Sequence, residues 1–290
     1  MKPPRPWLAA LLNLIAGSPI GQIYAGDLRR SVVIWFLGIF LLVSAAIAVV
    51  TFELSRIVML VLLGGVLLYQ IAYVIDAFFV ARRNGTSPRK SYQKWWFYIA
   101  MAIVFYSANY LSAVTIKTFV CEAFRVPSRS MSPTILHEDR ILVDRLWANP
   151  KTIKRYDVVV FRSNGMDSPL YVMRVIGLPG EKIEIRNRVV YINDEKLDDP
   201  KAIHDGPQIP GFDIENYGPK TIPEGHFFAL GDNRMRSKDS RFVGTIPLTD
   251  YYGHARWIFF SRDFELSDEQ DISEAVPGTI RWDRIGLRIQ

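Results

Sequence analysis

Long apolar runs fill the first part of the chain and are absent from the rest. Four such stretches cover residues 7–23, 32–50, 57–80 and 95–114. A helix that crosses a bilayer needs about 20 apolar residues, so the last three are predicted to span a membrane. Gly17, Ser18 and Pro19 interrupt the first stretch, and a proline inside a helix breaks it. This stretch is therefore predicted to be a re-entrant or interfacial segment.

After residue 120 the pattern changes to short alternating runs with frequent proline and glycine turns, which is typical of strands. The predicted fold is an N-terminal α-helical transmembrane region followed by a mostly β domain. We place the membrane region at 1–94, a membrane anchor at 95–114 and the β-rich domain at 115–290.

Basic residues predict the orientation of these helices. The loop over residues 81–94 carries five lysines and arginines and no acidic residue, which is typical of a cytoplasmic loop. The following helix then delivers the β-rich domain to the extracytoplasmic side of a multi-pass plasma-membrane protein. Asp76 precedes this loop, and we interpret it as an interfacial carboxylate near Arg82 and Arg83 rather than as a functional intramembrane charge.

Composition excludes several other classes of function. The net charge of +6 lies partly in loops beside apolar segments, and the soluble half has no basic patch interleaved with aromatic residues, so nucleic-acid binding is not expected. The single cysteine, Cys121, excludes an intramolecular disulfide and a multi-cysteine metal site. No metal and no cofactor is predicted.

Three polar segments of the soluble half carry the candidate chemistry. The first reads Glu-Ala-Phe-Arg-Val-Pro-Ser-Arg-Ser-Met-Ser-Pro-Thr-Ile over 122–135, where two prolines fix a serine-rich turn. The second, Tyr-Val-Met-Arg-Val-Ile-Gly-Leu-Pro-Gly over 171–180, is a strand closed by a turn. The third, Gly-Asp-Asn-Arg-Met-Arg-Ser-Lys-Asp-Ser-Arg over 231–241, is an unusually polar loop.

In this order and spacing, the three segments resemble the signature boxes of bacterial type I signal peptidases (leader peptidases, serine peptidase family S26). Asp-Arg-Ile-Leu-Val at 139–143, Tyr-Asp-Val-Val-Val-Phe at 156–161 and the tail Ile-Arg-Trp-Asp-Arg-Ile at 280–285 extend the resemblance over about 115–285. The N-terminal Pro-Ile-Gly-Gln-Ile-Tyr-Ala-Gly at 19–26, with Tyr-Val-Ile-Asp at 73–76, is similar to the small TM2-type membrane module.

The resemblance implies a role for individual residues. Ser130 matches the catalytic nucleophile, and Ser128 together with the Ser130 backbone N–H matches the oxyanion site. Ser237 matches a serine that positions the general base. Residues matching structural positions near the site are Asp232, Asp239 and Arg241. Residues matching the substrate pockets for small side chains are Phe124, Val126, Met131 and Val172.

The position of the general base departs from the family. Where relatives have a lysine whose neutral amine takes the serine proton, this chain has Met173. Methionine fills a similar volume, but its thioether is no useful base. Lys238 is the first substitute that we consider, ahead of the four histidines at 137, 204, 226 and 254.

The function implied by the resemblance is a serine endopeptidase that removes signal peptides from exported proteins at the outer face of the membrane, with preprotein signal peptides and membrane lipid as partners. Because of Met173, two alternatives stay open. One is a catalytically impaired relative that binds signal peptides or a partner; the other is a processing peptidase for a dedicated substrate. The resemblance also implies a β insertion at about 186–217, for which a solvent-facing appendage is expected.

The charge pattern predicts that reporter fusions after residue 90 and after residue 150 lie on opposite sides of the membrane. An alkaline phosphatase reporter should be active only after residue 150, and a cytoplasmic fluorescent reporter only after residue 90. The same side for both fusions would contradict the predicted orientation.

Overall fold

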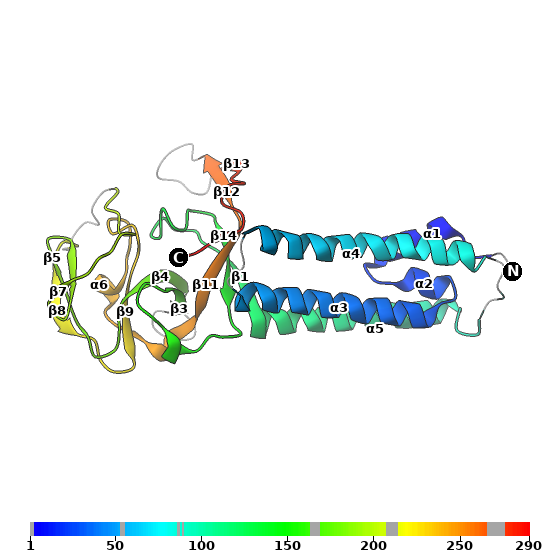
Figure 1. Ribbon diagram of the computed structural model, residues 1–290, viewed down its shortest axis with the longest axis horizontal. Coiled ribbons are helices and arrows are strands. Elements are labelled where there is room, and N and C mark those ends of the chain that lie inside the picture. The colour runs from blue at the N-terminus through cyan, green and yellow to red at the C-terminus, as the bar shows by residue number, and fades with distance from the viewer. Residues whose placement is uncertain are drawn as a thin grey trace. The chain divides into compact units, whose positions relative to one another are not determined.

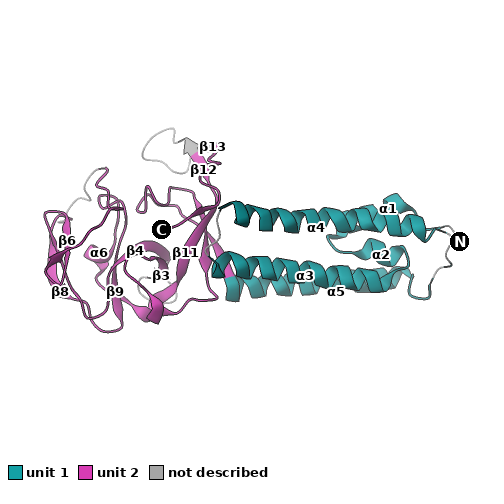
Figure 2. Ribbon diagram, in the orientation of Figure 1, with its two compact units in different colours: residues 1–120 teal, residues 121–290 magenta. Residues whose placement is uncertain are grey.

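The computed structural model describes residues 3–52, 56–85, 88, 90–162, 169–206, 214–265 and 276–290. The chain divides into two compact units, Met1–Val120 and Cys121–Gln290 (Figure 2). Three residues of the predicted cytoplasmic loop (86, 87 and 89) and part of the predicted insertion (207–213) lie outside the described residues. Each unit is considered by itself below.

The first unit consists of helices. Their bounds are α1 (Pro6–Ala16), α2 (Ile20–Tyr24), α3 (Leu28–Thr51), α4 (Arg56–Arg83) and α5 (Trp95–Thr115), which continues into a π-helical turn, η1 (Ile116–Val120). By length and hydropathy, three helices could cross a membrane: Leu28–Thr51, Arg56–Arg83 and Trp95–Val120. They contain the three predicted spans and extend them by up to six residues at an end.

The first apolar stretch is broken where the sequence predicts. Helix α1 ends at Gly17, whose φ of +58° is a left-handed conformation that glycine adopts without strain, and α2 begins after Pro19. At 1.5 Å per residue, the 11 residues of α1 extend for about 16 Å, which is half of a bilayer core. Helix α2 contacts α3, α4 and α5 and lies between α4 and the other two (Figure 1).

Buried polar side chains attach this broken segment to α4. The Asn13 amide donates to Gln22 Oε1 and to the Tyr73 carbonyl, both at 3.0 Å, and Gln22 Nε2 donates to Asp76 at 3.1 Å. Asp76 is paired with Arg30 of α3. The ion pair that the structure gives to Asp76 is therefore formed with Arg30 and not with Arg82 or Arg83, near which the carboxylate was expected to lie. A cation on the neighbouring helix satisfies the carboxylate instead.

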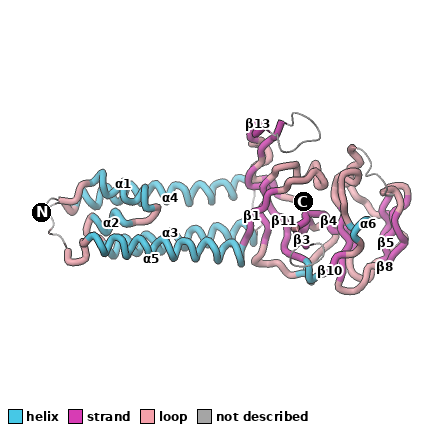
Figure 3. Tube along the Cα trace, turned by 180° about the vertical axis from the view of Figure 1, so that it is seen from behind, coloured by secondary structure: helices cyan, strands magenta, loops and turns pink. Residues whose placement is uncertain are grey.

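The second unit is antiparallel β structure in three sheets. The large sheet has the order β1-β2-β11-β3-β4-β9-β10, with β14 paired to β11; a four-stranded sheet has the order β7-β6-β5-β8, and β12 pairs with β13 (Figure 3). The bounds are β1 (Cys121–Arg125), β2 (Arg140–Asp144), β3 (Val158–Arg162), β4 (Leu170–Gly177), β5 (Lys182–Arg186), β6 (Val189–Ile192), β7 (Glu195–Lys196), β8 (Tyr217–Thr221), β9 (His226–Leu230), β10 (Ile246–Pro247), β11 (Tyr251–Phe260), β12 (Arg262–Glu265), β13 (Val276–Ile280) and β14 (Leu287–Arg288). Short helices add η2 (Pro150–Thr152), α6 (Ser240–Val243) and η3 (Leu248–Asp250). The predicted fold class, apolar helices followed by a mostly β domain, is confirmed.

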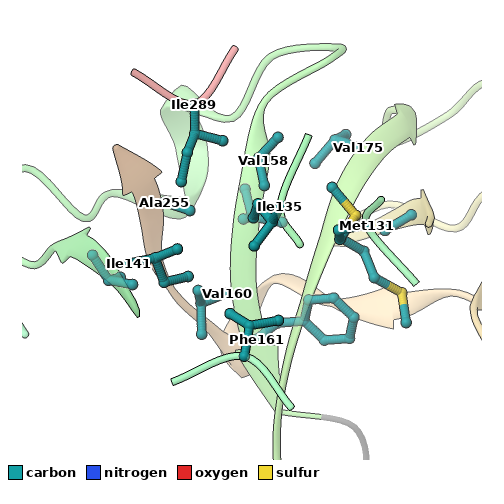
Figure 4. Close-up of a cluster of buried hydrophobic side chains, with 14 of the residues drawn as sticks. Met131, Ile135, Ile141, Val158, Val160, Phe161, Val175, Ala255 and Ile289 are labelled. Atoms are coloured by element: carbon teal, nitrogen blue, oxygen red, sulfur yellow. The ribbon is translucent and has the colours of Figure 1, made fainter. Parts of the chain in front are cut away.

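The core of the second unit forms around β3, whose first four residues are all buried. Such an uninterrupted apolar strand is covered on both faces. Figure 4 shows part of this cluster, in which Met131 and Ile135 from the serine-rich turn meet Val160, Phe161 and Val175. The turn is thus anchored by its own apolar residues.

The four-stranded sheet corresponds to the predicted insertion. Its strands begin at Lys182 and end at Thr221, so it includes one strand on either side of the expected 186–217. It has its own apolar cluster, with Ile183, Ile185 and Phe228 among its buried members. The sheet extends beyond the expected bounds because β5, which begins at Lys182, carries two of the buried residues of this cluster, Ile183 and Ile185.

A fully buried ion pair joins β4 to the polar loop after β9. Arg174, 1% exposed, donates from Nε and Nη2 to the two oxygens of Asp232, which is 0% exposed, with both distances 2.7 Å. Arg174 also donates to the carbonyls of Tyr156 and Gln290, at 2.9 and 3.0 Å. This bidentate geometry satisfies both charges without water.

We expect Arg174→Met to lower the free energy of unfolding by about 3–5 kcal/mol, because it leaves the Asp232 carboxylate buried without a cation. Urea unfolding of the detergent-solubilised full chain measures the change. The matched control is Lys182→Met, which removes an exposed ion pair to Asp194 and should change the same quantity by less than about 1 kcal/mol. Equal effects of the two substitutions would contradict the structural role of the buried pair.

Candidate functional site

Ser130 lies on a rigid turn that follows β1. The Val126 N–H donates to the Asp139 carbonyl at 2.9 Å, and the Ile135 N–H donates to the Met131 carbonyl at 2.9 Å. The Ser130 residue is 9% exposed, and its hydroxyl lies 3.0 Å from the hydroxyl of Ser128. Two serine hydroxyls are therefore held together at the edge of the buried core.

The polar loop 231–241 packs directly behind this turn. The Asn233 N–H donates to the Ser130 carbonyl at 2.9 Å. A Cβ atom at Gly231 would lie 2.6 Å from the same carbonyl oxygen and would overlap the Ser237 hydroxyl. Glycine is required here because the loop backbone touches both serines. Ser237 is thus brought next to Ser128 and Ser130, from which it is separated by more than 100 residues in the sequence.

A second ion pair shapes the loop from within. Asp239 accepts from Arg241 Nε at 2.9 Å and from the Gly231 N–H at 3.1 Å. Arg241 also donates to the carbonyls of Arg234 and Ser237, at 2.7 and 3.4 Å. These contacts place Asp239 and Arg241 around the loop backbone, while Asp232 faces Arg174 on the other side.

The segment after β7 braces the same loop. Arg234 is paired with Asp199, and both side chains are almost completely buried. The Ile203 N–H donates to the Asp232 carbonyl at 2.8 Å, and the Arg234 N–H donates back to Ile203 at 2.8 Å. The expectation of a purely solvent-facing appendage is therefore wrong for this segment, because an ion pair and two main-chain hydrogen bonds hold it against the loop that backs Ser130.

Met173 and Ser237 are the residues at the positions that the resemblance predicts for the general base and for the serine that positions it. The Met173 side chain is 4% exposed and belongs to the core cluster that contains Val126 and Met131. The Ser237 hydroxyl is buried and has no hydrogen-bond partner among the described residues. A buried hydroxyl without a partner loses the hydrogen bonds that water would give it. Among the described residues, the site therefore has a hydroxyl without a hydrogen-bond partner, and the apolar side chain of Met173 lies in the core.

The other candidate bases have partners elsewhere or are exposed. Lys238 is exposed. His137 lies 3.7 Å from Glu138, and burial lowers the pKa of its imidazole. His254 contacts Tyr251 and Asp157 at 2.5 and 3.0 Å on β11. The ring of the histidine at 226 lies 3.2 Å from a backbone carbonyl, and burial lowers the pKa of the histidine at 204. Among the described residues, the structure places the Ser128 hydroxyl at hydrogen-bonding distance from Ser130 Oγ.

A mostly apolar cavity of about 390 Å³ adjoins Ser130. It lies between two strand edges: β1 is the terminal strand of the large sheet, and residues Leu170–Met173 of β4 pair with β3 on one side only within the described residues. The lining residues are Phe124, Arg125, Val126, Pro127, Ser128, Ser130, Ile141, Val160, Pro169, Leu170, Tyr171 and Val172. An extended peptide could pair with these free edges and place side chains in the cavity.

Three of the four residues predicted to contact substrate line this cavity: Phe124, Val126 and Val172. Met131 does not, since its side chain is 0% exposed and packs in the core cluster. Its contribution is to anchor the turn beneath Ser130.

The sequence reasoning missed Thr134 and the partner of Arg174. Thr134 Oγ1 donates to Asp232 at 2.5 Å. The signal was present in the strand Val-Met-Arg-Val-Ile over 172–176, where an arginine in an apolar run requires a buried anion. No cluster of metal-ligating side chains occurs among the described residues. A serine pair beside an apolar peptide groove is instead suited to acyl transfer.

Removal of the hydroxyl should affect the free energy of unfolding differently at the two buried serines of the loop, Ser240 and Ser237. Ser240 Oγ accepts from the Ala229 N–H at 3.1 Å, so Ser240→Ala should lower the free energy of unfolding by about 1–3 kcal/mol, because that N–H is left unsatisfied. Ser237→Ala removes a group without a partner and should leave the free energy of unfolding nearly unchanged. Urea unfolding of both variants checks this, and an equal loss would show that the Ser237 hydroxyl is satisfied in the folded protein.

Comparison with known proteins places the sequence of this chain in a family. The family described as "Signal peptidase, peptidase S26" matches residues 92–260. Signal peptidase I of Bacillus caldolyticus is 33% identical over 168 residues, which are 56% of this chain and 86% of that protein. Signal peptidase I S of Bacillus subtilis is 32% identical over 184 residues, 62% of this chain and 95% of that protein.

Solved structures also match in sequence. A signal peptidase I from Enterococcus faecalis is 32% identical and covers 36% of this chain and 97% of that chain, but its TM-score is 0.29. The assignment therefore depends on the family match and on the sequence relatives. With more than half of its length in that match, this chain belongs to the signal peptidase family, peptidase S26.

Proposed function

We propose that this chain is a membrane-anchored peptide hydrolase of the signal peptidase type, which removes signal peptides from exported proteins. The observation that carries the proposal is the pair of hydroxyls of Ser130 and Ser128, 3.0 Å apart, beside a peptide-sized apolar cavity within the S26 match. The three long apolar helices support attachment to a membrane. The loop charges support an extracytoplasmic site.

In the proposed reaction, the substrate pairs as an added strand with the edges around Phe124 and Val172. Ser130 Oγ forms a bond to the scissile carbonyl carbon. The Ser130 N–H and the Ser128 hydroxyl donate to the developing oxyanion. The carbon–nitrogen bond then breaks, the new amine leaves with a proton, and water hydrolyses the acyl-serine ester. The apolar cavity would accept small side chains near the cleaved bond.

The step of this reaction that lacks a clear catalytic group is removal of the proton from the Ser130 hydroxyl. Met173 cannot accept it. The Ser237 hydroxyl, which has no hydrogen-bond partner among the described residues, lacks the amine that the resemblance assigns it to position. Without another base, the proton passes to water, and the loss of general-base assistance lowers the rate by about 10²–10⁴. The oxyanion donors and the groove retain part of the catalysis.

The same observation supports a second candidate function. A chain with an intact groove and no base would bind signal peptides, or a partner carrying such a sequence, without turnover. A processing peptidase with one dedicated substrate fits the same site, because a substrate could supply the missing group. Turnover of a generic substrate distinguishes these alternatives.

We expect Met173→Lys to raise the cleavage rate of a generic signal-peptide substrate by about 10²–10⁴, because it restores an amine beside the Ser237 hydroxyl. The full-length protein is assayed in detergent or vesicles with a fluorogenic peptide. Ser130→Ala in both backgrounds is the control and should abolish the gain. The rate of Met173→Lys should also rise with pH as the lysine loses its proton.

A natural protein that already cleaves at the rate of Met173→Lys would contradict the proposed loss of base. Lys238→Ala in the natural sequence would then test the nearest remaining amine of the loop. If the peptide binds with Met173 present but no variant cleaves it, the binding function replaces the peptidase.

A further inference from the structure

A polar cavity lies at the end of the membrane unit where α3 begins, α4 ends and α5 begins. Its volume is about 110 Å³, and Tyr24, Gly26, Asn84, Lys90 and Gln93 contribute to its lining. One water needs about 10–15 Å³ of such a cavity. This cavity therefore has room for a group of several heavy atoms.

Two amide side chains that line the cavity are held by backbone carbonyls of the segment after α2. Asn84 Nδ2 donates to the Ala25 carbonyl at 3.0 Å, and Gln93 Nε2 donates to the Tyr24 carbonyl at 2.7 Å. Gln93 Oε1 accepts from the Lys90 N–H at 2.7 Å, which joins the loop to the same amide. An amide NH₂ group has two hydrogens, so each of the two side chains retains one N–H for a further acceptor.

Positive charge surrounds the cavity and is little compensated. Lys90 lines the cavity, and its ammonium has no acidic partner among the described residues. The carboxylates described at this end are engaged with one residue, since Asp76 pairs with Arg30 and Asp27 accepts from the Arg30 N–H. Further exposed cations at this end are Arg5, Arg29, Arg82, Arg83 and Lys94. The cavity is therefore suited to an anion.

The depth of the cavity indicates which anion reaches it in a membrane. Trp95 and Trp96 at the start of α5 are 74% and 51% exposed. Exposed tryptophans gather at the level of the lipid headgroups. Since Gln93 directly precedes this pair, the cavity lies at headgroup depth, where the phosphates of the bilayer are found.

We propose that this cavity binds the phosphate of an anionic phospholipid. The Lys90 ammonium and the remaining N–H groups of Asn84 and Gln93 donate to the phosphate oxygens, and donors to an ionised acceptor form strong hydrogen bonds. A zwitterionic headgroup would add its own cation to a positive surface, so an anionic lipid is favoured. The predicted orientation places this end at the cytoplasmic leaflet, which carries anionic lipids. The site contains no residue of the proposed active site and does not depend on the proposed function.

Native mass spectrometry of the detergent-solubilised full-length chain tests the proposal by measuring the affinity for the first bound lipid. Phosphatidylglycerol is compared with phosphatidylcholine that has the same acyl chains, and inorganic phosphate is added as a competitor. The variants are Lys90→Gln and Lys90→Arg. The matched control is Lys94→Gln, which removes the same charge from the same loop at a residue outside the cavity lining.

The natural chain should bind phosphatidylglycerol at least about tenfold more tightly than phosphatidylcholine. Lys90→Gln should weaken this binding by about tenfold, the size expected for one charge-assisted hydrogen bond. Lys94→Gln should weaken it by less than about threefold, because an exposed charge outside the cavity contributes little. Lys90→Arg should retain most of the affinity. Inorganic phosphate at the lipid concentration should not displace the lipid, since it lacks the apolar chains.

Equal losses in Lys90→Gln and Lys94→Gln would overturn the proposal, because the lipid would then be attracted by charge without a defined site. Equal affinities for the two lipids would overturn it as well. Displacement by inorganic phosphate would show that the cavity takes a soluble anion instead of a lipid. Circular dichroism of each variant checks that it is folded, and a folded Lys90→Arg that binds no better than Lys90→Gln would also contradict the assigned role of this cation.

Discussion

The buried pair between Arg174 and Asp232 is the constraint on which the catalytic unit depends. It fixes β4, which forms one edge of the peptide groove, against the loop whose backbone supports the Ser130 carbonyl. An isolated buried charge would be prohibitively costly, so neither partner tolerates the absence of the other. The pair thereby sets the distance between the groove and the serine turn, and the contacts of Asp239, Arg241 and Arg234 refine the loop that it anchors.

The contacts that hold the site do not depend on the side chain at position 173. The scaffold around Ser130 is held by ion pairs and main-chain hydrogen bonds that do not involve position 173. Met173 can therefore join the apolar core at no cost to the fold, and its consequence is confined to chemistry. The Ser237 hydroxyl is buried and has no hydrogen-bond partner among the described residues. A substitution at position 173 can therefore change proton transfer without changing the fold, because other residues hold the scaffold around Ser130.

The membrane unit follows a related principle. Asn13 donates hydrogen bonds to Gln22 and to the Tyr73 carbonyl, Gln22 donates to Asp76, and Asp76 pairs with Arg30. These contacts between polar groups hold the broken helix in place within an apolar bundle.

The sequence by itself determined the order of membrane helices and β domain, the break at Gly17–Pro19, and the identity of the serine turn, because these follow from local hydrophobic pattern, proline geometry and contiguous motifs. Only the tertiary structure decided that Arg174 pairs with Asp232, that Met131 belongs to the core rather than to the groove, and that Asp76 pairs with Arg30. It also decided that Asp199 and Ile203 support the loop behind Ser130. Each of these contacts joins residues far apart in the chain. Their distances depend on how strands and helices pack, and a local pattern along the sequence carries no information about which distant side chain will supply the buried partner.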